Sequence, residues 1–243
     1  AGEHAGGPYT FDQNNLDCAI QGDYGVYCSV VDGVVTGSLG SPFRIVWAAG
    51  NARENSDCDI EGFGDFYTIE PPVSAKNHIA VGNVYSNDDT MTPSSGWGPT
   101  DDGRLKPDVC APGCQVGGDG GVTSTSAAGD ATYAVICGTS MAAPTVCGVL
   151  ALMIEDWRAL IGGPDPLNST LKALLAHTAV DLGNTGPDYQ FGYGSVRGKA
   201  AELEAGVYCT LALVVFGSAA GGPVRLRRPA AGGVRSSSKF MLA

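Results

Sequence analysis

Two apolar runs in the middle of the chain have the pattern of strands that are covered on both faces. Residues 44–51, RIVWAAGN, and residues 78–84, HIAVGNV, are mostly apolar without strict alternation and contain small residues or glycine. Such runs are typical of parallel strands buried in a sheet. Prolines punctuate residues 106–113, KPDVCAPG, which favours an extended connection or the end of a strand. Together these segments predict a mainly parallel sheet.

Three other segments have helical patterns. Residues 140–161, SMAAPTVCGVLALMIEDWRALI, carry apolar side chains on nearly every face as far as Met153, which predicts a buried helix. Ser140 is a suitable N-cap, and the following Gly-Gly-Pro ends the helix. Another helix is expected after Pro166, through STLKALLAHTA, and a short one within residues 24–36. Strands interleaved with buried helices indicate an α/β fold in which helices flank the sheet.

The distribution of charge argues against two classes of partner. The 243 residues have a formal net charge of −11, yet the last stretch, VRLRRPAAGGVRSSSKFMLA, holds five basic side chains and no acidic one. The rest of the chain therefore has 9 basic and 25 acidic residues, a formal charge of −16. Such an acidic body argues against nucleic acid or an anionic membrane as the main partner. No apolar run is long enough to predict a membrane span.

The eight cysteines are typical of an exported protein with a few disulfides. None forms a C-x-x-C pair, which argues against a zinc ribbon or a thioredoxin motif. Cys147 lies in the predicted buried helix and is expected to be a small buried thiol. Cys18, Cys28 and Cys58 leave room for a further pair that the sequence does not assign, and the sequon at Asn168 is compatible with export.

The hydroxyl at the start of the long helix, Ser140, has two interpretations. Most serines in such positions only cap the helix. However, Gly138, Ala142 and Ala143 are small enough to let a substrate chain reach the hydroxyl, and a helix N-terminus offers free N–H groups and a partial positive charge. Those features suit a nucleophile whose reaction forms a tetrahedral oxyanion.

The block GTSMAAP, residues 138–144, resembles the nucleophile motif of the subtilisin-like serine proteases. Other blocks resemble further parts of that family in the family's order, and the resemblance extends over roughly residues 20–205. It implies a subtilisin-like α/β fold. The other matching blocks are WAAGN (47–51), SAKNHIAVGNV (74–84), SGWGPTDDGRLKPDVCAPG (95–113), LLAHTAVDLG (174–183) and GPDYQFGYGSV (186–196).

The resemblance implies roles for several residues. Ser140 is expected to attack the scissile carbonyl and form an acyl-enzyme. The side-chain amide of Asn51 and the Ser140 N–H are expected to stabilise the oxyanion. The substrate is expected to contact small residues that leave room for its side chains and backbone, namely Ala48, Ala49, Gly50, Gly138 and Thr139.

No residue of this chain matches the activating part of the family's triad. In the family the catalytic Asp and His precede the serine in glycine-rich motifs, and neither motif occurs here. His78 is expected to pack within its strand, His177 comes after the nucleophile, and His4 and Asp23 lack matching flanks. We therefore interpret residues 1–206 as a partial peptidase domain, incomplete at its N-terminus, and expect the chain alone to be nearly inactive.

Two alternatives stay open. The chain could be a non-catalytic relative that serves as a binding or scaffold domain, and the coding sequence upstream of Ala1 would separate this from an enzyme. The second alternative is a serine hydrolase with a nucleophile elbow of the α/β-hydrolase type. Against it, that motif has a second glycine, which residues 138–142 lack.

The remaining expectations concern the surroundings of the domain. Cys114 and Cys137 bracket a glycine-rich loop before the nucleophile, and a bridge between them would fix the approach to Gly138. Metal sites are common in the family, so the resemblance allows a structural calcium ion, for which the sequence assigns no ligands. No other cofactor is expected. Residues 207–243 are expected to be a poorly ordered tail or the start of a truncated element. We expect a secreted monomer that acts on polypeptides.

Overall fold

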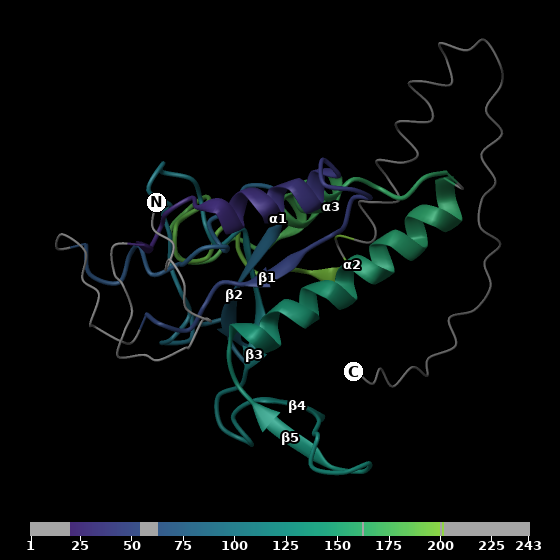
Figure 1. Ribbon diagram of the computed structural model, residues 1–243. Helices are drawn as coiled ribbons and strands as arrows, with labels where there is room; N and C mark the ends of the chain where they lie inside the picture. The colour runs from purple at the N-terminus through teal and green to yellow at the C-terminus, as the bar shows by residue number, and fades with distance from the viewer. Residues whose placement is uncertain (1–19, 54–62, 162, 200, 202–243) are drawn as a thin grey trace, which may run out of the picture.

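The described part of the chain comprises residues 20–53, 63–161, 163–199 and 201 of a computed structural model. Its main sheet has three parallel strands in the order β1–β2–β3 (Figure 1). These strands are β1 (Val46–Ala48), β2 (Ile79–Tyr85) and β3 (Val109–Cys114). Both predicted strands are confirmed, and the proline-punctuated segment also contributes a strand. The α/β fold class is therefore confirmed.

Two helices bury the apolar face of this sheet. α2, Thr139–Ile161, packs against all three strands (Figure 1), and α3, Asn168–Thr178, adds leucines to the same core. Full burial of such a side chain contributes about 1.5–3 kcal/mol. The core includes Ile79, Val81, Val109 and Ala111 from the strands, Ala142, Val146, Leu150 and Met153 from α2, and Leu171, Leu174 and Leu175 from α3.

The prediction that α2 is buried on all sides is wrong for one face. Cys147, Ala151 and Leu152 are exposed, and the prediction of a buried thiol at Cys147 is wrong with it. Residues four apart lie on the same face of a helix, so this face runs along α2 away from the core. The sequence predicted that every face of α2 is buried, because the helix carries apolar side chains around its whole circumference. The described residues cover only the side that meets the sheet.

β1 has an open edge on the side away from β2. Within the described ranges no strand pairs with that edge, and the side chain of Trp47 is 38% exposed. An edge strand presents unpaired N–H and C=O groups that can bind a further strand. The sheet can therefore be extended at β1.

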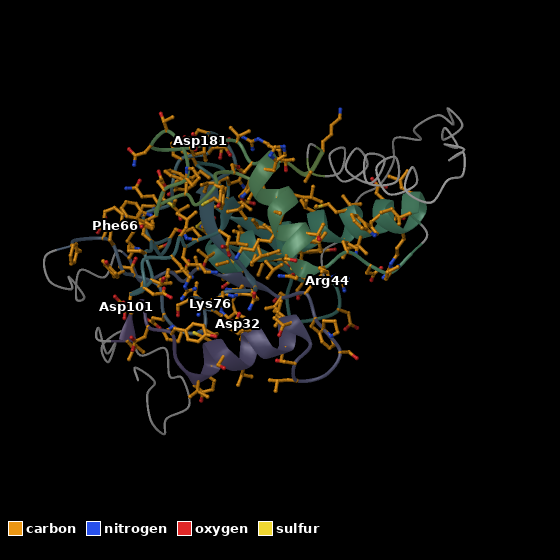
Figure 2. All side chains as sticks on the ribbon, turned by 90° about the horizontal axis from the view of Figure 1, so that it is seen from above. Asp32, Arg44, Phe66, Lys76, Asp101 and Asp181 are labelled. Atoms are coloured by element: carbon orange, nitrogen blue, oxygen red, sulfur yellow. A yellow bond between two sulfur atoms is a disulfide. The ribbon has the colours of Figure 1, made fainter. Side chains whose placement is uncertain are left out.

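α1, Val26–Thr36, confirms the short helix predicted near the start of the described region. Its buried Asp32 ties it to the loop before β2, beside Lys76 (Figure 2). The Asp32 carboxylate accepts the backbone N–H groups of Lys76 at 3.0 Å and Asn77 at 2.7 Å, and the Tyr24 hydroxyl at 2.7 Å. These bonds position α1 through its polar side.

A buried cluster of charges joins β3 to α3. Lys106 Nζ lies 3.0 Å from Asp108 Oδ2, and Lys172 Nζ lies 2.7 Å from Asp108 Oδ1. Burial by itself raises the pKa of Asp108, but the charges of Lys106 and Lys172 outweigh it and hold that pKa below its usual value. Burial lowers the pKa of Lys106 to about 8, against the opposing effect of Asp108. The carboxylate thus has two cationic partners in the interior.

His78 lies next to this cluster and is fully buried, as expected for a packing residue. Neither of its ring nitrogens has a hydrogen-bond partner in the described part of the chain. Burial, followed by the charge of Lys106, holds the pKa of His78 well below its ordinary value. The imidazole is therefore neutral in the folded state at neutral pH.

We expect His78 to make the protein less stable as the pH falls. An unfolded histidine titrates near pH 6.5, whereas folded His78 does not, so below about pH 6.5 the unfolded state binds more protons. The free energy of unfolding then falls by at most about 1.4 kcal/mol per pH unit. Asp101 acts in the opposite direction, because burial and Asp23 raise its pKa to about 6. Denaturant unfolding of wild type and His78→Leu across this range isolates the histidine, and equal slopes for the two proteins would contradict the prediction.

The second sheet is a hairpin that the sequence patterns did not predict. β4, Val122–Thr125, pairs antiparallel with β5, Tyr133–Ile136. The hairpin projects from the body on the side away from α1 (Figure 1). β4 consists mostly of Thr and Ser, and β5 is a run of only four residues that leaves Tyr133 and Val135 exposed. Neither strand has a buried face that marks it in the sequence.

Candidate active site

Ser140 lies in the first turn of α2 and is exposed. The helix begins at Thr139, so its N-cap is Gly138 and Ser140 is its second residue. The prediction that Ser140 is the N-cap is wrong by two positions. Just before the helix, the chain leaves β5 and passes through Cys137 and Gly138. The first N–H groups of a helix have no partner within it. The Ser140 N–H is one such donor, and it makes no hydrogen bond among the described residues.

Asn51 follows β1 and reaches the same helix start. Its Oδ1 accepts a hydrogen bond from the Thr139 N–H at 3.0 Å and another from the Thr139 hydroxyl at 3.1 Å. Because the oxygen end of the amide is held in this way, its Nδ2 end is left as the donor. The structure thus brings Asn51 next to the residue that precedes Ser140.

Gly138 makes this approach sterically feasible. Its φ of 153° lies in a region that side-chain-bearing residues rarely adopt, and a Cβ there would lie 3.3 Å from Asn51 Oδ1. Its N–H donates to the carbonyl of Gly113 at 3.3 Å, and its own carbonyl accepts the N–H of Met141 at 3.0 Å. The glycine therefore turns the chain from the hairpin into α2 without obstructing Asn51.

Two hydrogen-bond donors are unused at this site. Among the described residues, neither the Ser140 N–H nor Asn51 Nδ2 makes a hydrogen bond. Both lie at the start of α2, where the helix dipole adds positive potential. An oxygen that gains negative charge beside the Ser140 hydroxyl would meet a favourable electrostatic environment.

The predicted substrate-binding residues differ in how they can act. Ala48 packs against the hydrophobic core, and Ala49 and Thr139 are fully buried. Ala48 is only partly buried, whereas Ala49 exposes neither its side chain nor its backbone in the described structure. Gly50 is half-buried and Gly138 is buried at the turn, and neither presents a side chain.

His78, the described histidine that precedes Ser140 in the chain, is not placed to activate it. His78 is buried beside the charge cluster, whereas Ser140 is exposed. His177 lies in the last turn of α3, and His4 lies outside the described residues. Asp23 lies beside Asp101, and its proximity adds to the effect of burial in raising the pKa of Asp101 to about 6.

Comparison with known proteins decides the family. A sequence profile described as the subtilase family matches residues 13–194, which include Asn51 and Ser140. The chain belongs to the subtilase family. The fold class and the resemblance of the sequence blocks agree with this assignment.

The relatives of this subtilase are longer proteins. It is 35% identical over 130 residues to subtilisin-like protease 1 of Pseudogymnoascus destructans. The aligned residues are 54% of this chain and 26% of that protein. It is also 35% identical over 86 residues to fervidolysin of Fervidobacterium pennivorans. Those residues are 35% of this chain and 11% of that protein. The subtilase chain thus spans about a quarter of the first relative and less of the second.

A solved structure of a lanthipeptide protease has the same fold as this subtilase. The two superpose with a TM-score of 0.55 at 22% identity, over 73% of this chain and 54% of the other. At this level of identity the similarity shows the fold alone. It agrees with the parallel sheet and flanking helices described above.

The predicted disulfide between Cys114 and Cys137 of the subtilase is confirmed. It joins the last residue of β3 to the residue before Gly138, at the root of the β4–β5 hairpin. Beside it, Gly138 N–H bonds the Gly113 carbonyl. The bridge therefore closes the loop that leads to Ser140.

Cys28 is buried and free, so it is not part of a further pair, and Cys18 and Cys58 lie outside the described residues.

We expect the double substitution Cys114→Ala and Cys137→Ala to lower the free energy of unfolding by about 3 kcal/mol, because it opens a loop of about twenty residues in the unfolded state. Denaturant unfolding measures the change. Cys147→Ala removes an exposed thiol and is the matched control, with an expected change within about 0.5 kcal/mol. Equal stabilities of the double variant and wild type would contradict a stabilising bridge.

Sequence reasoning missed one part of this subtilase site. Arg53, two residues after Asn51, makes three hydrogen bonds to two other segments of the chain. No motif marks it, because its partners are two backbone carbonyls and a carboxylate from distant loops.

As for metals, the described ranges contain no group of three His, Cys, Asp or Glu side chains arranged to bind an ion.

Proposed function

We propose that this chain contains the C-terminal part of the catalytic domain of a serine endopeptidase, which cleaves polypeptides through an acyl-enzyme on Ser140. The observation that carries the proposal is the pair of unused donors, Asn51 Nδ2 and Ser140 N–H, beside an exposed hydroxyl at a helix N-terminus. Subtilase membership supports the general peptidase class.

In this mechanism the Ser140 oxygen attacks the scissile carbonyl carbon and its proton passes to a general base. The carbonyl oxygen becomes an oxyanion and accepts hydrogen bonds from the two donors. Collapse of the intermediate expels the amine, and water then hydrolyses the ester on Ser140. A serine hydroxyl is a weak nucleophile without a base. We therefore expect the 243-residue chain alone to react slowly.

Two surfaces suit the segment that would supply this base. β1 has an open edge, and the exposed face of α2, with Cys147, Ala151 and Leu152, begins two turns after Ser140. A polypeptide that adds a strand to β1 and covers α2 would bury apolar area and lie beside the nucleophile. This placement is consistent with a base contributed from outside the described residues.

Labelling with a fluorophosphonate probe tests the proposal. The probe should label Ser140 rapidly in a protein expressed with the coding sequence upstream of Ala1, slowly in the 243-residue chain, and not at all in Ser140→Ala. Peptide mass spectrometry locates the adduct. Rapid stoichiometric labelling of the 243-residue chain would overturn the requirement for an external base, and no labelling of the longer protein would overturn the nucleophile assignment.

A second candidate is a non-catalytic subtilase that serves as a binding or scaffold domain. It is favoured by one observation, that His78, the described histidine ahead of Ser140 in the chain, is fully buried and has no hydrogen-bond partner for its ring among the described residues. An upstream coding sequence without catalytic Asp and His motifs would support this alternative. The labelling experiment separates the two candidates.

The proposed protein is a secreted monomer whose partners are its polypeptide substrates. The Cys114–Cys137 bridge supports export, since disulfides persist in oxidising compartments. None of the helices in the described ranges has the length and apolar character needed to cross a membrane. Structural calcium remains a proposal without assigned ligands.

A further inference from the structure

Arg53 is a charged residue with a mostly buried side chain. It lies two residues after Asn51, and its side chain is only 11% exposed. Arginine is rarely buried to this extent unless its charge and donors are matched. The surroundings of Arg53 therefore indicate a specific task.

The guanidinium uses all three of its nitrogens. Nε donates to the carbonyl of Ser95 at 2.8 Å, Nη2 to the carbonyl of Thr92 at 2.7 Å and Nη1 to the carboxylate of Asp65 at 3.0 Å. Its central carbon lies 4.1 Å from the centre of the Trp97 ring. Lysine cannot reproduce this set, because it lacks the planar fork and the stacking surface. The side chain thus joins residues 92–97 to the segment that follows β1.

The same loop also holds the residue before Asn51. Gly96 N–H donates to the Gly50 carbonyl at 3.0 Å. A Cβ on Gly96 would lie 2.8 Å from the Ala49 carbonyl oxygen, so only glycine permits this approach. On the other side of Asn51, the Arg53 N–H donates to the Ser94 carbonyl at 3.3 Å.

This loop is itself fixed to the sheet. Ser95 is fully buried, and its hydroxyl accepts the N–H of Asn83 in β2 at 3.0 Å. Trp97 is supported by Phe66, whose ring centre lies 5.4 Å from that of Trp97. Arg53 therefore connects the end of β1 to a rigid support.

Asn51 has no comparable support of its own backbone. Within the described residues, its N–H and carbonyl make no backbone hydrogen bond, and the residue is exposed. Its position is set by its neighbours and by the two bonds from Thr139 to Oδ1. No strand directly follows Asn51 in the described residues, and Arg53 anchors the chain on its C-terminal side. Loss of the Arg53 contacts would therefore make the position of Asn51 less fixed.

We propose that Arg53 is a positioning residue that clamps residues 92–97 to the segment after β1 and thereby holds the Asn51 amide against Thr139. The catalytic consequence rests on the proposed function, because it assumes that Asn51 Nδ2 stabilises an oxyanion. The structural part of the proposal, a coupling of Arg53 to the Asn51–Thr139 bond, does not depend on catalysis.

Amide hydrogen exchange of the 243-residue chain tests this coupling. In Arg53→Met the Thr139 N–H, which donates to Asn51, should exchange at least about tenfold faster, as expected for loss of bonds to a charged group. Arg53→Lys should give a smaller change in the same direction. The Val81 N–H in the buried strand β2 serves as the internal reference for global opening, and its exchange should change less than that of Thr139.

Asp65→Asn is the matched control. Asp65 is 55% exposed, and this substitution weakens one contact while the Thr92, Ser95 and Trp97 contacts stay in place. We expect it to leave Thr139 exchange within about twofold of wild type, as for other exposed ion pairs. Equal acceleration at Thr139 and Val81 in Arg53→Met, or no acceleration at Thr139, would overturn the proposal. Failure of Ser140 to react with the fluorophosphonate probe would overturn the proposed function and leave the exchange result intact.

Discussion

Replacing Asp108 with alanine is expected to lower the free energy of unfolding by about 3–5 kcal/mol, the usual cost of removing one partner of a buried ion pair. Asp108 accepts bonds from Lys106, Lys172 and the Ala80 N–H. Lys106 is only 1% exposed, so the substitution leaves its ammonium group in the interior without a counter-charge. Denaturant unfolding at neutral pH measures the loss.

Two further variants make this prediction specific. Asp108→Asn keeps an oxygen that can accept the Ala80 N–H and removes only the charge, so its destabilisation should be smaller than that of the alanine variant. Asp165→Ala breaks the ion pairs with Arg158 and Arg44 and is expected to destabilise the protein much less than Asp108→Ala, because solvent screens exposed ion pairs. A change in Asp108→Ala no larger than that in Asp165→Ala would show that Lys106 finds another way to stabilise or lose its charge.

Replacing Asn51 with alanine is expected to lower kcat for peptide hydrolysis by a factor of about 10²–10³, the typical effect of removing one oxyanion donor. The substitution removes Nδ2 from its place beside Ser140 and also the Oδ1 atom that Thr139 bonds. The assay uses the protein expressed with its upstream coding sequence, because the proposed mechanism needs a base. KM should change much less than kcat, since the oxyanion forms only during the reaction.

Asn51→Asp separates the donor from the packing around it. It keeps an oxygen that can accept the Thr139 bonds and removes the N–H that faces the substrate, and its added charge repels an oxyanion. We expect kcat to fall at least as far as in Asn51→Ala, with the Thr139 bonds retained. A kcat for Asn51→Asp close to that of wild type would exclude Asn51 as the oxyanion donor.

The parts of the fold that the sequence predicted are those with a strong apolar pattern. β2 and α2 are mostly apolar, and both occur close to the predicted bounds. The β4–β5 hairpin was missed because β4 consists mostly of Thr and Ser, both strands are only four residues long, and neither has a buried face. The exposed face of α2 was missed for the opposite reason. An apolar pattern shows that a helix surface avoids water, but it does not show which polypeptide covers that surface.

The candidate site was predictable to a different degree for different residues. Ser140 and Asn51 were predicted from their motifs, and the structure places both at the start of α2. The use of Asn51 Oδ1 by Thr139 depends on how two distant segments meet, which neither motif specifies. Arg53 is harder still to predict, since its acceptors include backbone carbonyls that any residue type provides.

The bridged hairpin has a consequence for the integrity of the molecule after a peptide-bond cut. Residues 127–133 at its tip are exposed throughout, and such tips are preferred sites of nicking by proteases. A cut there falls between Cys114 and Cys137, so the two pieces would stay covalently joined. The piece that carries Asn51 would therefore stay covalently linked to the piece that carries Ser140 for as long as the bridge is oxidised.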